Sequence, residues 1–151
     1  MRRCLLAVVL SCAVLGGASW AQRVIRPFPK EVFAAKTVEI VNNTHNEAVE
    51  QGAVEALRRW GRFTVVDDTD LADITLTFDK KSEHEGSSSQ TTGDDGKPSS
   101  SYSMSFSSSI HMSAAVKGSD RPFYAATTNE SKKKAGAECV TALQGAFASA
   151  R

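Results

Sequence analysis

The side chains that could carry out acid–base or metal chemistry are few and scattered along the chain. The three histidines are His45, His84 and His111, and none stands in an HExxH or Cys/His metal-ligand spacing. Glu83 and Glu85 flank His84, but that segment supplies no rigid geometry for a metal, so we interpret it as a solvated polar stretch. The spacing of the histidines therefore gives no indication of a metal site.

The sequence also lacks a motif that would identify a catalytic nucleophile or a catalytic pair of carboxylates. The sequence contains no GxSxG, no Walker A loop and no GxGxxG, although serine is abundant. Cys139 falls on an apolar helical stripe, away from the basic or helix N-terminal setting that makes a thiol reactive. Five aspartates lie around two predicted strands and could in principle act as paired catalytic carboxylates: Asp67, Asp68, Asp70, Asp73 and Asp79. Aspartates near strand ends more often terminate strands. We expect no catalytic, cofactor-binding or metal-ligating residue, and no cofactor.

Residues 1–21 have the pattern of a secretory signal peptide. A positive pair at Arg2–Arg3 precedes an apolar run over residues 5–15, and Ser19 and Ala21 supply the small residues of a cleavage site. The run is shorter than the roughly 20 apolar residues that a spanning helix needs. The pattern predicts an exported protein whose mature chain begins at Gln22.

An alternative assigns Cys12 a lipid. The residues Val9 to Cys12 loosely resemble a bacterial lipobox, which would make the protein a lipoprotein anchored at Cys12. Only residues 5–10 would then remain as the apolar run, fewer than the about 7–15 of an ordinary signal. A cleaved signal peptide is therefore the preferred interpretation.

Charge and cysteine content narrow the classes of partner. Without the two arginines of the signal, 16 basic residues stand against 17 acidic ones, a net charge of −1 with histidine neutral. A balance near zero gives no electrostatic footprint for nucleic acid or for anionic lipid. Whether the protein associates with a membrane is left open. One remaining cysteine, Cys139, makes no internal disulfide, so the hydrophobic core must hold the fold alone.

The mature chain opens with an extended leader over residues 22–35, followed by one domain over residues 36–151. Residues 36–42 predict a strand, and Thr44 with Glu47 forms a capping box for a helix that ends at Trp60 before Gly61. Short strands are expected over residues 62–66 and 72–78. The apolar helical stripe consists of Val49, Ala53, Ala56, Leu57 and Trp60.

Residues 80–101 change in composition to serine, glycine, aspartate and threonine, with no large apolar side chain. This favours a long flexible hairpin loop. Its functional interpretation is a binding or lid segment, and the simpler one is a connector without a role.

Residues 102–116 then give the clearest strand, with apolar residues at the even positions and serine at most odd ones. Another strand is expected over residues 121–128. Ser131 can cap a final helix, whose stripe we expect to contain Ala135, Cys139, Ala142, Leu143 and Ala146, with Val140 and Phe147 at its margins. The lysines at 132–134 are expected at a solvated helix end.

The element order is therefore β-α-β-β-β-β-α, and each helix has one apolar stripe. Two helices on one face of a four- to five-stranded, mostly antiparallel sheet would bury every stripe at once. The sequence predicts this α+β architecture, with the first helix joining two strands that could pair in parallel.

Part of this pattern resembles small envelope domains of Gram-negative bacteria. The similarity covers Thr37–Val41, the helix ending in Ala56–Phe63, Thr64–Asp67 and Ala72–Leu76. The families are the lipopolysaccharide-assembly lipoproteins, the ABC-type transport auxiliary lipoproteins and the small domain of the Tol-system β-propeller protein. The resemblance implies a non-enzymatic helices-on-sheet domain that binds envelope partners, and it implies no functional residue.

Taken together, these observations favour an exported, non-enzymatic binding or assembly-accessory domain in the periplasm or associated with the outer membrane. Its expected partner is an envelope protein or an outer-membrane component. The alternative is a small secreted hydrolase, which would need Asp, His and Ser side chains to meet in one cleft.

Overall fold

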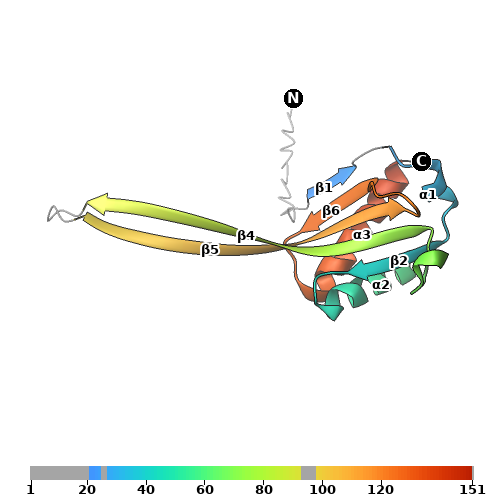
Figure 1. Ribbon diagram of the computed structural model, residues 1–151, viewed down its shortest axis with the longest axis horizontal. Coiled ribbons are helices and arrows are strands. Elements are labelled where there is room, and N and C mark those ends of the chain that lie inside the picture. The colour runs from blue at the N-terminus through green and yellow to red at the C-terminus, as the bar shows by residue number, and fades with distance from the viewer. Residues whose placement is uncertain (1–20, 25–26, 93–97, 151) are drawn as a thin grey trace, which may run out of the picture.

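The computed structural model describes the backbone of residues 21–24, 27–92 and 98–150, and the side chains of residues 27–82 and 107–150. Residues 1–20, which hold Cys12 and all of the predicted signal except Ala21, lie outside the described residues. One six-stranded sheet runs through the molecule in the order β1-β6-β5-β4-β2-β3, and the two long helices α2 and α3 cover one of its faces (Figure 1). The predicted α+β class is confirmed.

The sheet is mixed, with three antiparallel and two parallel strand pairs. β2 (Thr37–Asn42) pairs in parallel with both β3 (Thr64–Val65) and β4 (Ile74–Thr92). β5 (Pro98–Val116) pairs antiparallel with β4 and with β6 (Tyr124–Thr128), which also pairs antiparallel with β1 (Ala21–Val24). The expected parallel pair across the first long helix is therefore present as β2 and β3, and β4 extends the parallel part.

The helix α2 (Glu47–Trp60) begins two residues later than predicted, because Asn46 rather than Thr44 is its N-cap. The Asn46 side chain accepts a hydrogen bond from the Ala48 N–H at 3.1 Å. Thr44 is buried, and its hydroxyl donates to Asn42 Oδ1 at 2.6 Å. At the other end Gly61 has φ +68° and its N–H bonds to the Leu57 carbonyl, which confirms the predicted stop.

The second long helix, α3 (Lys132–Ser149), packs directly against α2 through glycine. A Cβ placed on Gly136 would lie 1.9 Å from the Val49 carbonyl oxygen, and one on Gly52 would lie 1.9 Å from the Lys133 oxygen. Ser131 is the N-cap residue, although its side chain makes no capping hydrogen bond. The two backbones touch because neither glycine carries a side chain.

The core lies between the helices and the sheet, and it contains most of the predicted stripes. Val49, Ala53, Ala56 and Leu57 are buried in α2, as are Ala135, Cys139, Ala142 and Leu143 in α3. Val140 and Phe147 are also fully in the core, where only a marginal position was expected. Trp60 is half-buried and packs edge-on against Phe63 and Phe147, with ring centroids 5.1 and 5.7 Å apart.

The predicted parity of the long strand is confirmed where side chains are described. Ile110, Met112 and Ala114 are buried against the helices, whereas His111 and Ser113 lie half-exposed on the opposite face. That face of the sheet carries no helix (Figure 1). The expected orientation of residues 102–106 concerns side chains outside the described ones.

The region expected to be a loop is mostly β-strand. β4 and β5 continue through it as one ladder, from Ile74 paired with Val116 to Thr92 paired with Pro98. The outer part of this hairpin projects from the body as a two-stranded ribbon, which we call the arm: residues 79–92 and 98–109 (Figure 1). Composition misled the prediction, because hydrogen bonding to a neighbouring strand does not require apolar side chains.

The leader is also more ordered than an extended segment. Residues 21–24 form β1 at one edge of the sheet, and Lys30–Ala34 form a short helix, α1. Phe28 and Phe33 bring this segment onto the body, with the Phe28 ring 5.0 Å from Phe123 and the Phe33 ring 5.0 Å from Phe147. Aromatic packing therefore ties residues 27–35 to the end of α3.

Candidate functional site

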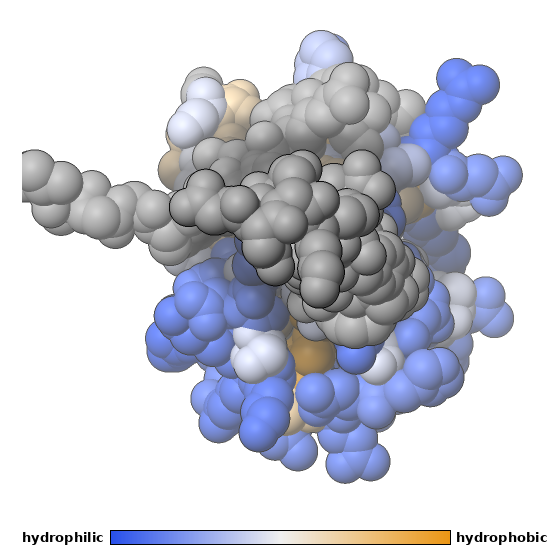
Figure 2. Space-filling view, turned by 90° about the vertical axis from the view of Figure 1, so that its left-hand side faces the viewer, coloured by the Kyte–Doolittle hydropathy of each residue, from blue (hydrophilic) through white to orange (hydrophobic). Residues whose placement is uncertain are grey.

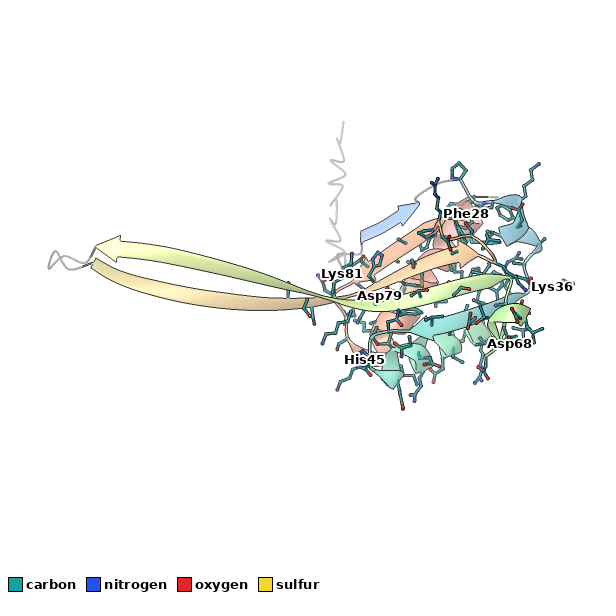
Figure 3. All side chains as sticks on the ribbon, in the orientation of Figure 1. Phe28, Lys36, His45, Asp68, Asp79 and Lys81 are labelled. Carbon is teal, nitrogen blue, oxygen red and sulfur yellow. The ribbon has the colours of Figure 1, made fainter. Side chains whose placement is uncertain are left out.

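A row of polar side chains crosses the uncovered face of the sheet at the root of the arm. The register places Asp79 of β4 opposite His111 of β5, and His111 opposite Thr127 of β6. His111 Nδ1 lies 2.9 Å from Thr127 Oγ1, and Asn43 Nδ2 donates to Asp79 Oδ1 at 3.0 Å. Figure 3 shows Asp79 beside Lys81 where the arm leaves the body.

The environment of His111 disfavours its charged form. Burial is the main cause that lowers the pKa of His111, and the nearby Lys81 ammonium lowers it further. The Asp79 carboxylate opposes both effects, but the net shift of the pKa is downward. The environment therefore favours the neutral form of His111.

This row is the arrangement on which the hydrolase alternative depends. An imidazole in contact with a hydroxyl, with a carboxylate one strand away, contains the side-chain types of an acyl-transfer site. The hydroxyl belongs to Thr127 rather than to one of the many serines, and Asp79 Oδ1 already accepts the Asn43 amide. The predicted parity of residues 102–116 implies that the odd-numbered His111 lies on the open side, but parity within one strand does not predict the contact with Thr127.

Two of the predicted aspartates bind backbone. Asp68 accepts the Asp70 N–H at 2.9 Å and caps the short 3₁₀ turn η1 (Thr69–Leu71). Asp73 Oδ2 accepts the N–H groups of Lys36 at 2.8 Å and Thr37 at 3.0 Å, which joins the start of β2 to the start of β4. Asp73 therefore fixes a strand end, as expected, whereas Asp68 caps a turn.

The other candidates remain apart. Cys139 is buried, and burial raises the pKa of its thiol to about 12, so it is not a thiolate at neutral pH. His45 is exposed in the turn before α2, with φ +56°. The side chains of Glu83, His84 and Glu85 lie outside the described ones. Within residues 27–82 and 107–150, no three His, Cys, Asp or Glu side chains are grouped so that they could hold a metal ion.

The three lysines at the start of α3 are exposed, and two of them are paired with carboxylates. Lys133 Nζ lies 2.5 Å from Glu55 Oε1 on α2, and Lys134 Nζ lies 2.7 Å from Glu130 Oε1. Ion pairs this exposed contribute little to stability. The predicted solvated helix end is confirmed.

A pocket that the sequence analysis missed lies where α2 and α3 end. It has a volume of about 680 Å³ and is lined by Trp60, Gly61, Arg62, Gln144, Phe147 and Ala148. The Arg62 guanidinium carbon lies 4.3 Å from the centre of the Phe147 ring, and Arg62 Nη2 donates to the Phe33 carbonyl at 2.7 Å. These contacts hold Arg62 against the aromatic cluster at the end of α3.

The arm presents free backbone edges. β2 pairs with β4 only as far as Phe78, and β6 pairs with β5 only from Ile110, so no described strand flanks the ribbon beyond these residues. Where the residues are coloured, the face shown in Figure 2 is largely hydrophilic, with small apolar areas at several places. A strand edge of this length is a template for another strand.

The hydrogen bonds at the body end of the hairpin show which residues of the arm direct their backbone N–H and C=O groups away from the hairpin. The Lys117 N–H bonds to the Asp73 carbonyl, and this odd-numbered pair therefore bonds within the β4–β5 ladder. The even-numbered carbonyls of Phe78 and Ala114 accept from Asn43 and Phe123 instead, outside the hairpin. Because the register is continuous, the even-numbered residues of the arm direct their N–H and C=O groups to its free edges.

One signal in the sequence could have revealed the arm. The alternation of apolar and serine residues ends at Tyr102, but the serine and threonine residues at positions 87–92 and 99–101 are also compatible with a strand. Pro98 stands at an even position, where a missing N–H costs no bond within the hairpin.

Across the described residues, no helix is both long and apolar enough to cross a membrane. No family model and no curated protein sequence matches this chain. Among solved structures it is similar to the PelC dodecamer from Paraburkholderia phytofirmans, at 15% sequence identity and a TM-score of 0.42, covering 83% of this chain and 96% of that one. A point variant of the same PelC dodecamer gives a TM-score of 0.45 at the same identity and coverage.

Proposed function

We propose that this protein is an exported, non-enzymatic binding or assembly-accessory domain of the bacterial envelope, and that the arm is its binding element. The observation that carries the proposal is the projecting ribbon, residues 79–92 and 98–109, whose outer edges no described strand covers. An isolated two-stranded hairpin is marginally stable in water. A projecting ribbon of this length is therefore suited to a partner that adds to it.

Export and location are supported by the sequence. The signal pattern of residues 1–21 favours passage across the inner membrane. The resemblance to small envelope domains supports a location in the periplasm or at the inner face of the outer membrane. Intact-mass analysis of the exported protein tests this: we expect a chain that begins at Gln22, whereas a lipid-modified chain beginning at Cys12 would show an anchored lipoprotein.

The test of the arm is a shortened variant in which an Asn-Gly turn joins Glu83 directly to Ser107. These two residues form an odd-numbered, hydrogen-bonded pair, so a two-residue turn can close the hairpin there. We expect the native chain to co-purify envelope proteins from membrane and periplasmic fractions, as identified by mass spectrometry, and the shortened chain to lose them.

A matched control keeps the arm and changes the pocket at the end of α3. Gln144 is exposed and lines that pocket, so Gln144→Ala should leave the co-purified set unchanged. If the shortened chain folds and retains the whole set while Gln144→Ala loses it, the binding element is the pocket and the proposal for the arm is wrong.

The hydrolase alternative is favoured by one contact, the 2.9 Å approach of His111 Nδ1 to Thr127 Oγ1. A nucleophilic hydroxyl activated by histidine should react with a fluorophosphonate probe. We expect no adduct at Thr127 by peptide mass spectrometry. An adduct that Thr127→Val and His111→Gln both abolish, in chains that remain folded, would establish the hydrolase instead.

A further inference from the structure

The pocket at the ends of α2 and α3 has the size and the walls of a small-molecule site. Its volume of about 680 Å³ falls within the roughly 300–1,000 Å³ typical of ligand pockets. Trp60 and Phe147 contribute aromatic rings to the lining, whereas Gly61 and Ala148 contribute no large side chain. The pocket therefore has room for an organic molecule rather than only for a water molecule or a single ion.

Trp60 gives this pocket a rigid apolar wall. Its ring lies at 86° to the Phe63 ring and at 78° to the Phe147 ring, with centroids 5.1 and 5.7 Å away. Phe63 and Phe147 are buried, whereas Trp60 is half-buried and lines the pocket. A ring that is already fixed in place offers apolar surface to a ligand and loses little conformational freedom on binding.

Arg62 gives the same pocket a positive charge in a fixed position, and it is the one charged residue of the lining. Its guanidinium carbon lies 4.3 Å from the centre of the Phe147 ring, and its Nη2 donates to the Phe33 carbonyl at 2.7 Å. Arg58 and Arg59 add positive charge in the last turn of α2. A planar guanidinium that is held in this way is well suited to recognise an anion.

We propose that this pocket binds an amphiphilic organic anion, a small molecule that carries an anionic group on an apolar ring or short apolar chain. The apolar part packs against Trp60, and the anionic group lies beside the Arg62 guanidinium. An inorganic anion would leave the indole uncovered, and a neutral hydrocarbon would gain nothing from the positive charge. Only a ligand with both parts uses both walls of the pocket.

This site is separate from the arm. All of its lining residues belong to α2, to the turn after α2 or to α3. The C-terminal end of α3 lies on the side of the body away from the arm (Figure 1). The inference therefore goes beyond the proposed function, and either of the two can fail without the other.

Binding can be measured with the fluorescent probe anilinonaphthalene sulfonate, which joins a sulfonate to an aromatic ring system. The chain has two tryptophans, so a Trp20→Phe chain reports on Trp60 alone. Titration of this chain should show saturable binding at a single site, with energy transfer from Trp60 to the probe. The uncharged analogue phenylnaphthylamine serves as the second probe and lacks the anionic group.

A filled pocket should exclude both probes. Ala148→Phe adds a large side chain at an exposed position of the lining, so it should abolish binding while the chain remains folded. Ala150→Phe is the matched control, because it adds the same side chain at an exposed position just beyond α3 that does not line the pocket. The control should bind both probes as the native chain does.

The role of the positive charge is tested by Arg62→Gln. This change should lower the affinity for the sulfonate probe about tenfold, the effect of one lost charge-assisted hydrogen bond. The affinity for the uncharged probe should stay within about twofold, because the apolar wall is retained. Added salt gives the same contrast in the native chain: it should weaken binding of the sulfonate probe and leave the uncharged probe unaffected.

The results separate this site from the arm. The shortened-arm variant should bind the sulfonate probe as the native chain does, and a folded shortened chain that no longer binds it would place the site on the arm. A native chain without saturable binding, or binding that Ala148→Phe leaves intact, would overturn the pocket as a ligand site. Equal effects of both Arg62→Gln and salt on the two probes would overturn the recognition of an anion. Circular dichroism establishes that each variant is folded.

Discussion

At the scale of single residues, the contact between α2 and α3 depends on two positions without side chains. Gly136 and Gly52 meet backbone carbonyl oxygens of the facing helix, where a Cβ would lie at 1.9 Å. Backbone cannot move aside as a flexible side chain can. The two helices must therefore separate or shift if either position gains a methyl group.

We predict that Gly136→Ala lowers the free energy of unfolding by at least the ~1–3 kcal/mol typical of overpacking. Gly145→Ala is the matched control in the same helix, because nothing lies within 4 Å of its Cβ position. That change should raise the free energy of unfolding by about 0.5–1 kcal/mol through helix propensity. Urea denaturation followed by circular dichroism measures both, and equal effects of the two substitutions would refute the close contact.

Asp73 gives the fold an acid-sensitive link. The backbone N–H groups of Lys36 first and Thr37 second hold the pKa of Asp73 below its ordinary value. The folded state thus binds its proton less readily than the unfolded state. This contribution to stability is complete above the unfolded pKa, about 3.9, and is lost as the pH falls through the lower folded pKa.

We therefore expect Asp73→Asn to be less stable than the native chain at pH 7, with a difference that shrinks below about pH 4. Urea unfolding at several pH values measures the difference. Asp68→Asn is the comparison, since Asp68 caps only the short turn η1. A difference that stays constant down to pH 2 would show that the Asp73 carboxylate does not act through its charge.

At the scale of the elements, α2 is held by its apolar stripe more than by its caps. Leu57 is completely buried between the helices and the sheet, whereas Leu71 of η1 is 63% exposed. The two leucines are the same size, so they separate the effect of burial from that of side-chain volume.

Leu57→Ala should cost about 2–5 kcal/mol of unfolding free energy, the range for a buried leucine that leaves a cavity. Leu71→Ala should cost less than about 0.5 kcal/mol, as for other exposed positions. Thermal or chemical denaturation of the two variants measures the contrast. A loss below half a kcal/mol at Leu57 would mean that the stripe does not face the core.

At the scale of the whole molecule, the body and the arm have separate sources of stability. The body buries its apolar residues between two helices and the sheet, and the neighbouring strands pair with the hairpin only up to Phe78 of β4 and from Ile110 of β5 onward. The arm adds two strands joined only to each other beyond Asp79. The body should therefore fold without it.

The shortened-arm variant that joins Glu83 to Ser107 should unfold cooperatively, with a free energy of unfolding within about 1 kcal/mol of the native value. Loop length enters the closure entropy only logarithmically, so removal of the arm changes that term little. Chemical denaturation followed by tryptophan fluorescence measures this, because Trp60 packs in the body. Failure of this chain to fold would show that the arm stabilises the body.

The sequence alone determined the elements whose side chains repeat with a period. Local spacing predicts the apolar stripe of α2, the buried even-numbered positions Ile110 and Met112, and the end of α2 at Gly61. It also predicts the α+β class. Asn46 replaced Thr44 as the cap because several adjacent polar residues can accept the same N–H groups. Local sequence patterns identify that a helix begins near residue 46, and tertiary packing selects which residue caps it.

Only the tertiary structure decided the remaining features, because they depend on what lies alongside a segment. The arm is strand because each residue pairs with one that is distant in the sequence, and serine is no obstacle to that pairing. Phe147 is in the core because Phe28 and Phe33 return to cover it. The row from Asp79 to Thr127 exists only because register aligns three strands. Residues far apart in the chain set these positions, and composition along the chain does not record them.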